Sequence, residues 1–239
     1  MMKKVCQLVL IGLALIVASA GCGPVESPSA PIAPVKQTVG RIKDTWIKAD
    51  DTKGVKLEDN LLRKNIYLIF DCSGSMVGRK IAAAKEAINQ FGKSIPEDTG
   101  LGLAIFDGHG LSERLPLGVN NRKEFFAVVN AASADGGTPL SEAVKIGYES
   151  LKAQARRQLG YGEYHLVIVT DGEANMGYDP TDMVNLILRE SPVVIHTIGF
   201  EIGPEHSLNQ PGRTIYKDAQ SPKDLEEGLQ SVMAEADTY

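Results

Sequence analysis

Four short apolar runs recur along the chain from residue 65 onward, and each run is nearly continuous. They cover residues 66–70, 101–106, 165–169 and 193–198. A strand with helices on both of its faces has no side that meets water, so its sequence lacks the polar alternation of a half-exposed strand. The four runs therefore predict the central strands of a mostly parallel sheet.

Amphipathic segments lie between the apolar runs. Their apolar residues fall at spacings of three and four, which places them on one face of a helix. These sets are Ile81, Ala84, Ile88 and Phe91; Leu140, Ala143, Val144, Gly147 and Leu151; and Leu225, Leu229 and Val232. Strands that alternate with such helices form an open sheet through right-handed crossovers. We therefore expect a Rossmann-like α/β fold, doubly wound, with helices on both faces and residues 111–119 as an antiparallel edge strand.

Several of the helices carry start signals. Thr138, Asp179 and Ser221 each precede a proline, and a capping residue followed by proline at the first helical position is a common helix start. Asn121, with Glu124 three residues later, resembles a capping box. We expect helices to begin at these four points.

The first fifth of the chain has a different pattern. Lys3 and Lys4 precede one apolar run over residues 8–18, which is shorter than the roughly 20 residues of a membrane-spanning helix. A basic start, a short apolar centre and small residues before a cleavage point are typical of a signal peptide. We assign residues 1–21 to such a signal.

The end of this signal, Ser19-Ala20-Gly21-Cys22, is similar to the lipobox of bacterial lipoproteins, although Ser19 stands where an aliphatic residue is usual. The resemblance implies that cleavage precedes Cys22 and that this cysteine is lipidated, which anchors the protein to a membrane. The alternative is ordinary cleavage nearby, with Cys22 incidental. The residue after Cys22 is not the aspartate of inner-membrane retention, which favours the outer membrane of a bacterial cell envelope.

Prolines are dense directly after Cys22. Pro24, Pro28, Pro31 and Pro34 alternate with small and polar residues. Such density favours an extended, semi-rigid spacer over packed structure. We therefore assign residues 22–60 to a lipidated tether and linker, and residues 61–239 to one folded domain.

Three polar clusters follow strands or open a helix in the predicted sheet. They are Asp71-Cys72-Ser73-Gly74-Ser75, Asp135-Gly136-Gly137-Thr138-Pro139 and Thr170-Asp171-Gly172-Glu173. Ligands of open α/β sheets bind beyond the carboxyl ends of the strands, so we expect these clusters to meet at one edge. The candidate donors are oxygens, and the sequence has no histidine or cysteine pair at metal-ligand spacing. Oxygen donors suit Mg²⁺, with Mn²⁺ or Ca²⁺ as alternatives, and argue against zinc.

The clusters resemble the metal ion-dependent adhesion site of the von Willebrand factor type A domain, which has the pattern Asp-x-Ser-x-Ser, then a separate Thr, then a separate Asp. The matching residues are, in order, Asp71, Ser73, Ser75, Thr138 and Asp171. The resemblance covers about residues 65–237. It implies direct ligation by both serines, direct or water-mediated ligation by the threonine, and ligation by the two aspartates at least partly through water. It leaves Asp107, Asp135 and Glu173 as candidates for the rim.

A coordination sphere built mostly of neutral hydroxyls leaves the charge of a cation poorly compensated, so a free coordination position favours a carboxylate. The resemblance therefore implies a non-enzymatic module that binds a protein partner through its Asp or Glu. One alternative is a scaffold or assembly factor of an envelope complex with a structural metal. Another is a metal-dependent phosphoester hydrolase that uses Asp71 or Asp171, although the sequence offers it no obvious general base.

The sequence argues against nucleic acid and nucleotides as ligands. The formal net charge of -5 gives no reason to expect nucleic acid. Gly92-Lys93-Ser94 ends like a phosphate-binding loop, but Ala87 stands where that motif needs glycine. The first strand is not followed by the triple-glycine dinucleotide fingerprint. Cys72 follows a buried strand, and we expect it to pack as a small apolar residue.

Overall fold

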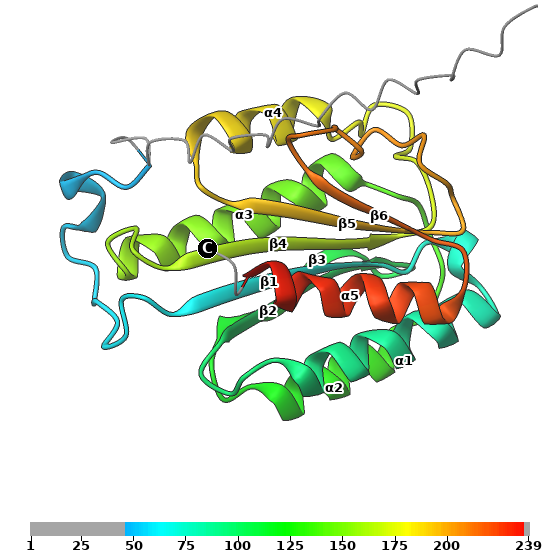
Figure 1. Ribbon diagram of the computed structural model, residues 1–239, viewed down its shortest axis with the longest axis horizontal. Helices are drawn as coiled ribbons and strands as arrows, with labels where there is room; N and C mark the ends of the chain where they lie inside the picture. Colours follow the sequence, from blue (N-terminus) through cyan, green and yellow to red (C-terminus); the bar gives the residue numbers. More distant parts are fainter. Residues whose placement is uncertain (1–45, 237–239) are drawn as a thin grey trace, which may run out of the picture. The chain divides into compact units, whose positions relative to one another are not determined.

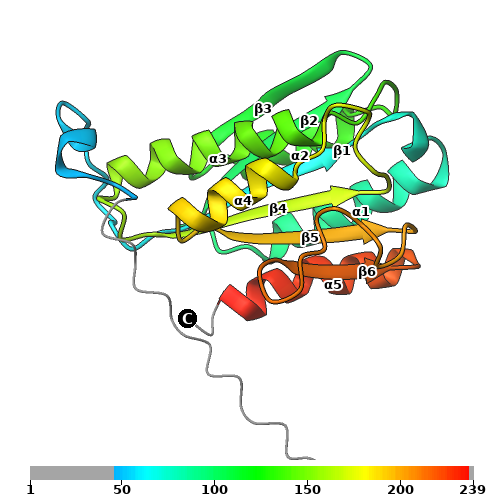
Figure 2. The same ribbon diagram turned by 90° about the horizontal axis from the view of Figure 1, so that it is seen from above.

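A six-stranded sheet lies between two layers of helices in the computed structural model, which describes residues 46–236 (Figure 1). The strands are β1 (Lys64–Asp71), β2 (Gly100–Asp107), β3 (Gly110–Gly118), β4 (Glu163–Thr170), β5 (Val194–Phe200) and β6 (Ile215–Ala219). Their order across the sheet is β3-β2-β1-β4-β5-β6, which Figure 2 shows from above. Only β2 and β3 pair antiparallel; the other neighbours are parallel. The expected α/β class is thereby confirmed.

The helices cover both faces of the sheet. They are α1 (Arg79–Ser94), α2 (Arg122–Ala131), α3 (Leu140–Arg157), α4 (Thr181–Glu190) and α5 (Pro222–Ala236), with short 3-10 turns η1 (Ala49–Thr52) and η2 (Gly74–Met76). Apolar side chains of α1, α2 and α5 share one buried cluster with the sheet, and those of α3 and α4 share the other. Figure 1 accordingly shows α3 and α4 above the sheet and α1, α2 and α5 below it.

The four apolar runs correspond to β1, β2, β4 and β5, and the expected edge strand corresponds to β3. The sequence did not indicate β6. This strand lies at the opposite edge of the sheet, where most of its residues are only partly buried. An edge strand with a mixed polar sequence has neither the continuous apolar run nor the strict alternation that marks a strand.

The expected helix starts are partly confirmed. Helix α5 begins at Pro222, and the Ser221 hydroxyl accepts a hydrogen bond from the Asp224 amide at 3.2 Å, as a capping serine does. Helices α3 and α4 instead begin one residue after their prolines. The Asp179 carboxylate nevertheless accepts a hydrogen bond from the Thr181 amide at 2.8 Å, which is the capping contact predicted for it. The prediction for Thr138 was wrong by one position, since the residue directly before α3 is Pro139.

The predicted capping box at the start of α2 was also wrong. Asn121 does occupy the position before the helix, but its side chain makes no capping hydrogen bond. Its amide Nδ2 instead donates to the carbonyl oxygen of Leu101 at 2.7 Å. A tertiary contact with the start of β2 thus replaces the local one.

Residues 46–60 pack against the domain, although we assigned them to the tether. Trp46 is buried, and its ring lies edge-on to that of Tyr164 with 4.7 Å between centroids. The Glu58 amide donates to the carbonyl of Arg157, and the Glu58 carboxylate pairs with Arg63 at 2.6 Å. Packed structure therefore begins before residue 61.

The predicted signal peptide, Cys22 and the proline-rich spacer lie outside the described residues. Within residues 46–236, none of the helices combines the length and apolar character needed to cross a membrane.

Two buried histidines face each other across the strands β4 and β5. His165 Nδ1 and His196 Nε2 are 3.2 Å apart, and the residues are 3% and 2% exposed. Val167 and Ile198 stand two residues further along the same strands, so the histidines share with them the face covered by α1 and α5. Burial, followed by the charge of Lys64, lowers the pKa of His165 to about 4. Burial, followed by the charges of His165 and Lys217, lowers the pKa of His196 to about 3.

We expect the free energy of unfolding to fall as the pH drops from neutrality toward 4. Because both folded-state pKa values lie below the unfolded value of about 6.5, the unfolded chain binds more protons in this window. Each histidine contributes a slope of at most about 1.4 kcal/mol per pH unit. Urea unfolding at a series of pH values measures this slope. His196→Gln, which keeps a polar group opposite His165, should flatten it; an unchanged slope in the variant would contradict the assignment.

Candidate functional site

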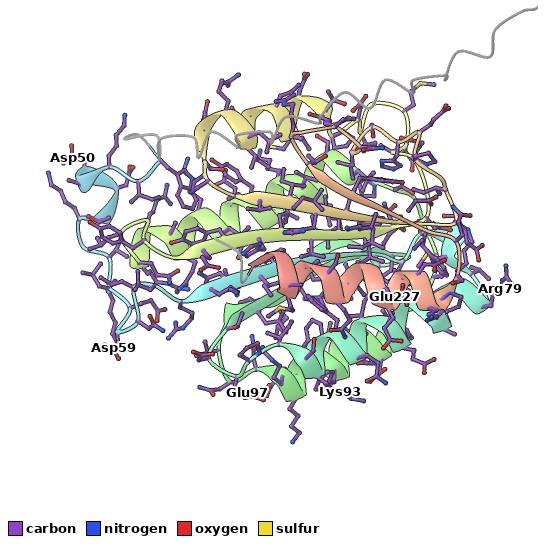
Figure 3. All side chains as sticks on the ribbon, in the orientation of Figure 1. Asp50, Asp59, Arg79, Lys93, Glu97 and Glu227 are labelled. Carbon is purple, nitrogen blue, oxygen red and sulfur yellow. The ribbon has the colours of Figure 1, made fainter. Side chains whose placement is uncertain are left out.

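Three segments that are distant in sequence meet at the carboxyl edge of the sheet. β1 ends at Asp71 and β4 ends at Thr170 beside it, since Phe70 pairs with Val169 in the parallel register. The loop before α3 joins them, because the Gly74 amide donates to the Gly136 carbonyl at 3.0 Å. All three predicted clusters therefore lie at one edge, near Arg79, which Figure 3 labels at the start of α1.

A chain of hydrogen bonds connects the hydroxyl and carboxylate groups at this edge. The Ser73 and Ser75 hydroxyl oxygens are 3.0 Å apart. The Ser75 hydroxyl donates to Asp171 Oδ1 at 2.6 Å. Both serine side chains thus point to the same side of the turn, toward a carboxylate 96 residues further along the chain.

Asp71 lies beneath this chain and is fully buried. Its Oδ1 accepts from the Ser73 amide at 2.8 Å, which sets the turn, and its Oδ2 accepts from the Thr170 hydroxyl at 2.6 Å. Burial raises the pKa of Asp71, and the charge of Asp171 adds to the rise, although the hydrogen bonds from Ser73 and Thr170 oppose it. Two neighbouring carboxylates with little access to water are costly when both are ionised, so this edge favours a cation.

Thr138 is held by a side chain that the sequence did not indicate. The Thr138 amide donates to Asn175 Oδ1 at 2.5 Å, and the Asn175 amide returns a hydrogen bond to the Thr138 carbonyl at 3.1 Å. This reciprocal contact satisfies the amide that precedes α3 and joins the loop to the segment after β4. Pro139, the residue before the helix, has a non-helical ψ of 62°, so α3 begins at Leu140.

Lys80 is a second unpredicted member of the site. It is the second residue of α1, and its ammonium nitrogen lies 2.6 Å from Asp171 Oδ2. Asp171 therefore accepts from a serine on one carboxylate oxygen and from a lysine on the other.

His206 supports the loop that follows Asp171. Its Nδ1 accepts from the Leu208 amide at 3.0 Å, which leaves the proton of the neutral ring on Nε2. Nε2 then donates to the Gly172 carbonyl at 3.0 Å. Because both ring nitrogens are engaged, we interpret this histidine as a positioning residue. No spacing in the sequence links it to the aspartate loop.

The three rim candidates, Asp107, Asp135 and Glu173, form hydrogen bonds or ion pairs with residues outside the chain that links Ser73, Ser75 and Asp171. Asp107 pairs with Arg114 at 2.9 Å and is largely buried. Asp135 accepts from the Gly136 amide at 2.7 Å, within its own turn. The exposed Glu173 accepts from the Ser207 hydroxyl at 3.2 Å.

The donor set fits a hard cation. Within residues 46–236, no group of three or more histidine, cysteine, aspartate or glutamate side chains could hold a metal. An ion at this edge would therefore depend on hydroxyls as well as on two aspartates, which is the chemistry of Mg²⁺, Mn²⁺ or Ca²⁺. Cys72 is buried, and burial, with the charges of Asp71 and Asp107, raises the pKa of its thiol, so it offers no thiolate.

The family model of the von Willebrand factor type A domain matches residues 65–233. Among curated proteins, the chain is 26% identical over 188 residues to the uncharacterised protein YwmC of Bacillus subtilis, covering 68% of this chain and 79% of that protein. It is also 26% identical over 183 residues to inter-alpha-trypsin inhibitor heavy chain H4 of Sus scrofa. That alignment covers 71% of this chain but only 20% of the much longer heavy chain.

Solved structures with a similar fold include adhesive and metal-bound proteins. The pilus adhesin SpaC of Lactobacillus rhamnosus GG has a TM-score of 0.59 at 16% identity, over 75% of this chain and 31% of the adhesin. Manganese-loaded TRAP protein of Plasmodium vivax has a TM-score of 0.56 at 21% identity, over 72% of each chain. Mussel byssus proximal thread matrix protein 1, with a zinc-occupied MIDAS motif, has a TM-score of 0.56 at 16% identity, over 73% of this chain and 46% of that one.

These structural likenesses show the fold, and the family match covers more than half of the chain. Proteins of this fold include a pilus adhesin, a manganese-loaded protein and one with zinc in its MIDAS motif. The protein belongs to the von Willebrand factor type A domain family.

Proposed function

We propose that this protein binds a partner protein through a divalent cation held at the carboxyl edge of the sheet. The observation that carries the proposal is the linked set Ser73, Ser75 and Asp171, with the buried Asp71 beneath it. Hydroxyls and carboxylates converge there from segments about a hundred residues apart, although each residue alone would suit an ordinary turn.

The residues that would hold the ion are Ser73, Ser75, Thr138, Asp71 and Asp171. A Mg²⁺ ion there would supply a Lewis-acidic position for an oxygen ligand, and Mn²⁺ or Ca²⁺ could replace it. The protein's own residues orient the donors: the turn set by Asp71 presents both serine hydroxyls, and Asn175 fixes the threonine. A carboxylate from a partner Asp or Glu would complete the coordination.

The structure supports this role over the two alternatives. A metal that served only to stiffen a scaffold would have little to add, because backbone hydrogen bonds already tie the loops together. Gly74 to Gly136 and Asp135 to Cys72 join the first two loops, and the Asn175 amide joins the third to Thr138. A hydrolase needs a general base that a water molecule or substrate can reach. Asp71 is fully buried, the buried Asp171 carboxylate is paired with Lys80, and His206 uses both of its ring nitrogens.

We further propose a lipid anchor at Cys22, with the domain on a bacterial cell envelope and the outer membrane favoured. The support is the signal-like segment of residues 1–21 and the lipobox-like end at Cys22. The proline-rich stretch that follows would hold the domain away from the membrane surface.

Replacing Asp71 by asparagine should separate metal binding from folding. We expect Asp71→Asn to lose Mg²⁺ binding, measured by isothermal titration calorimetry. In EDTA, its melting temperature should rise by roughly 2–4 °C, since about 1 kcal/mol of burial penalty on a carboxylate is removed. Asp182→Asn, which removes an exposed carboxylate in α4, is the control and should change neither measurement. Retained Mg²⁺ binding in Asp71→Asn would reject the proposed ion site.

Partner binding should require both the cation and the site. In pull-downs from envelope extract, we expect the wild-type protein to retain a partner in Mg²⁺ and release it in EDTA, and Ser75→Ala and Asp71→Ala to retain none. Ser150→Ala, in α3 and with its hydroxyl bonded to Glu113 of β3, is the matched control and should behave as wild type. A partner retained equally in EDTA and by Asp71→Ala would show that recognition does not use the ion.

Cys22→Ala should release the protein from the membrane. Expressed in a bacterium that carries the lipoprotein pathway, the wild-type protein should fractionate with membranes and incorporate a labelled fatty acid. The variant should do neither, because the acceptor thiol is absent. Lipid incorporation by the variant would contradict the assignment of Cys22.

A further inference from the structure

Lys80 places a positive charge inside the site. Its ammonium nitrogen is 2.6 Å from Asp171 Oδ2, and the Asp171 side chain is fully buried while that of Lys80 is 23% exposed. An ion pair with one fully buried partner is weakly screened by water, so its charge acts strongly on whatever else binds that carboxylate. The neighbouring Arg79 differs in this respect: its side chain is 86% exposed and pairs with Glu201.

The Lys80 ammonium group and the proposed metal ion would both interact with the Asp171 carboxylate. Asp171 accepts from Ser75 through Oδ1 and from Lys80 through Oδ2, and Ser75 is a proposed ligand of the ion. A cation held by Ser75 and Asp171 therefore lies close to an ammonium group of the same sign. The repulsion between them raises the free energy of the metal-bound state.

The formal charges also decide what the loaded site attracts. With Asp71 and Asp171 ionised and Lys80 protonated, the three side chains carry one net negative charge. A divalent cation changes that to one net positive charge, whereas without the lysine the loaded site would be neutral. Net positive charge favours an anionic ligand over a neutral oxygen such as a carbonyl or hydroxyl.

We propose that Lys80 is a specificity-determining residue that weakens binding of the divalent ion and, once the ion is bound, strengthens binding of a carboxylate to it. This inference rests on the proposed metal-dependent function and names the part of the chain that makes the site select anions. The site thereby gives up part of its metal affinity in return for discrimination between ligands.

The test compares four variants of the protein with the wild type. Lys80→Met removes the charge, Lys80→Gln removes it but can still donate a hydrogen bond to Asp171, and Lys80→Arg keeps it. Arg79→Met is the matched control, because it removes the same charge one residue away, where the side chain extends outward (Figure 3). Circular dichroism and melting temperature establish that each variant is folded.

The first measurement is the affinity for Mn²⁺ and Mg²⁺ by isothermal titration calorimetry. We expect Lys80→Met and Lys80→Gln to bind the ion about tenfold more tightly than wild type, and Lys80→Arg and Arg79→Met to stay within about twofold, because only the contact charge acts on Asp171. If one neutral variant fails to fold, the other gives the same comparison.

The second measurement is the binding of acetate to the Mn²⁺-loaded protein, followed by paramagnetic relaxation of the acetate ¹³C nuclei. We expect the neutral variants to bind acetate several-fold more weakly than wild type. A purely structural lysine would instead lower the melting temperature and leave both affinities unchanged, and that result would overturn the proposal.

The outcomes separate this inference from the proposed function. If the wild type binds the ion but the neutral variants do not bind it more tightly, the role of Lys80 is rejected and the metal site stands. If neither the wild type nor any variant binds Mn²⁺ or Mg²⁺, both proposals fail. If only the neutral variants bind the ion, the result supports the proposal that Lys80 weakens ion binding.

Discussion

The hydrogen bond from the Thr170 hydroxyl to Asp71 joins the ends of two central strands, and the rest of the site depends on it. The residues are 99 positions apart in sequence, yet the parallel register of β1 and β4 brings them side by side. One strand then continues into the serine turn and the other into Asp171. Had β4 paired antiparallel, its carboxyl end would lie at the opposite edge, and no local sequence could bring the two aspartates together.

Placing Asp71 in this position costs stability, and the sheet around it offsets the cost. Burial raises its pKa, which means that its ionised form is held in an unfavourable environment. The strand that carries it is otherwise buried and apolar from Ile66 to Phe70, with helices packed on both faces. A carboxylate can be kept dry and fixed at the end of such a strand, whereas on a surface loop it would be solvated and mobile. The stability of the packed sheet is therefore what allows the Asp71 carboxylate to be held in an unfavourable, buried position.

The fold could be predicted from the sequence to the extent that burial is uniform along an element. β1, β2, β4 and β5 are covered on both faces, so each appears as an apolar run. β6, at an edge, has no comparable signal. The start of α3 was misplaced by one residue, because Pro139 has a non-helical ψ of 62°. The loop before it is held by Asn175 through the Thr138 amide, a contact that spans 37 residues and has no local signature.

The residues of the candidate site also differ in whether the sequence could indicate them. Asp71, Ser73 and Ser75 form a short motif, and their order with Thr138 and Asp171 could be recognised in the sequence alone. Lys80 and His206 could not, because they act through contacts 91 and 34 residues away. A lysine in the first turn of a helix is ordinary until the register of that helix against the sheet is known. The charge balance of the site is therefore a tertiary property, even though the order of its candidate ligands can be recognised in the sequence.

The packing of Trp46 has a mechanical consequence. Trp46 lies against Tyr164, at the beginning of β4, whereas the serine turn and Asp171 lie at the far ends of β1 and β4. These strands are about 25 Å long at roughly 3.3 Å per residue. For a domain tethered at its amino terminus and gripped by a partner at the opposite edge, tension would run along β1, which pairs with β2 on one side and β4 on the other. Such a load would shear two ladders of hydrogen bonds at once instead of breaking them one by one, so the proposed anchor and ligand would load β1 in its mechanically stronger direction.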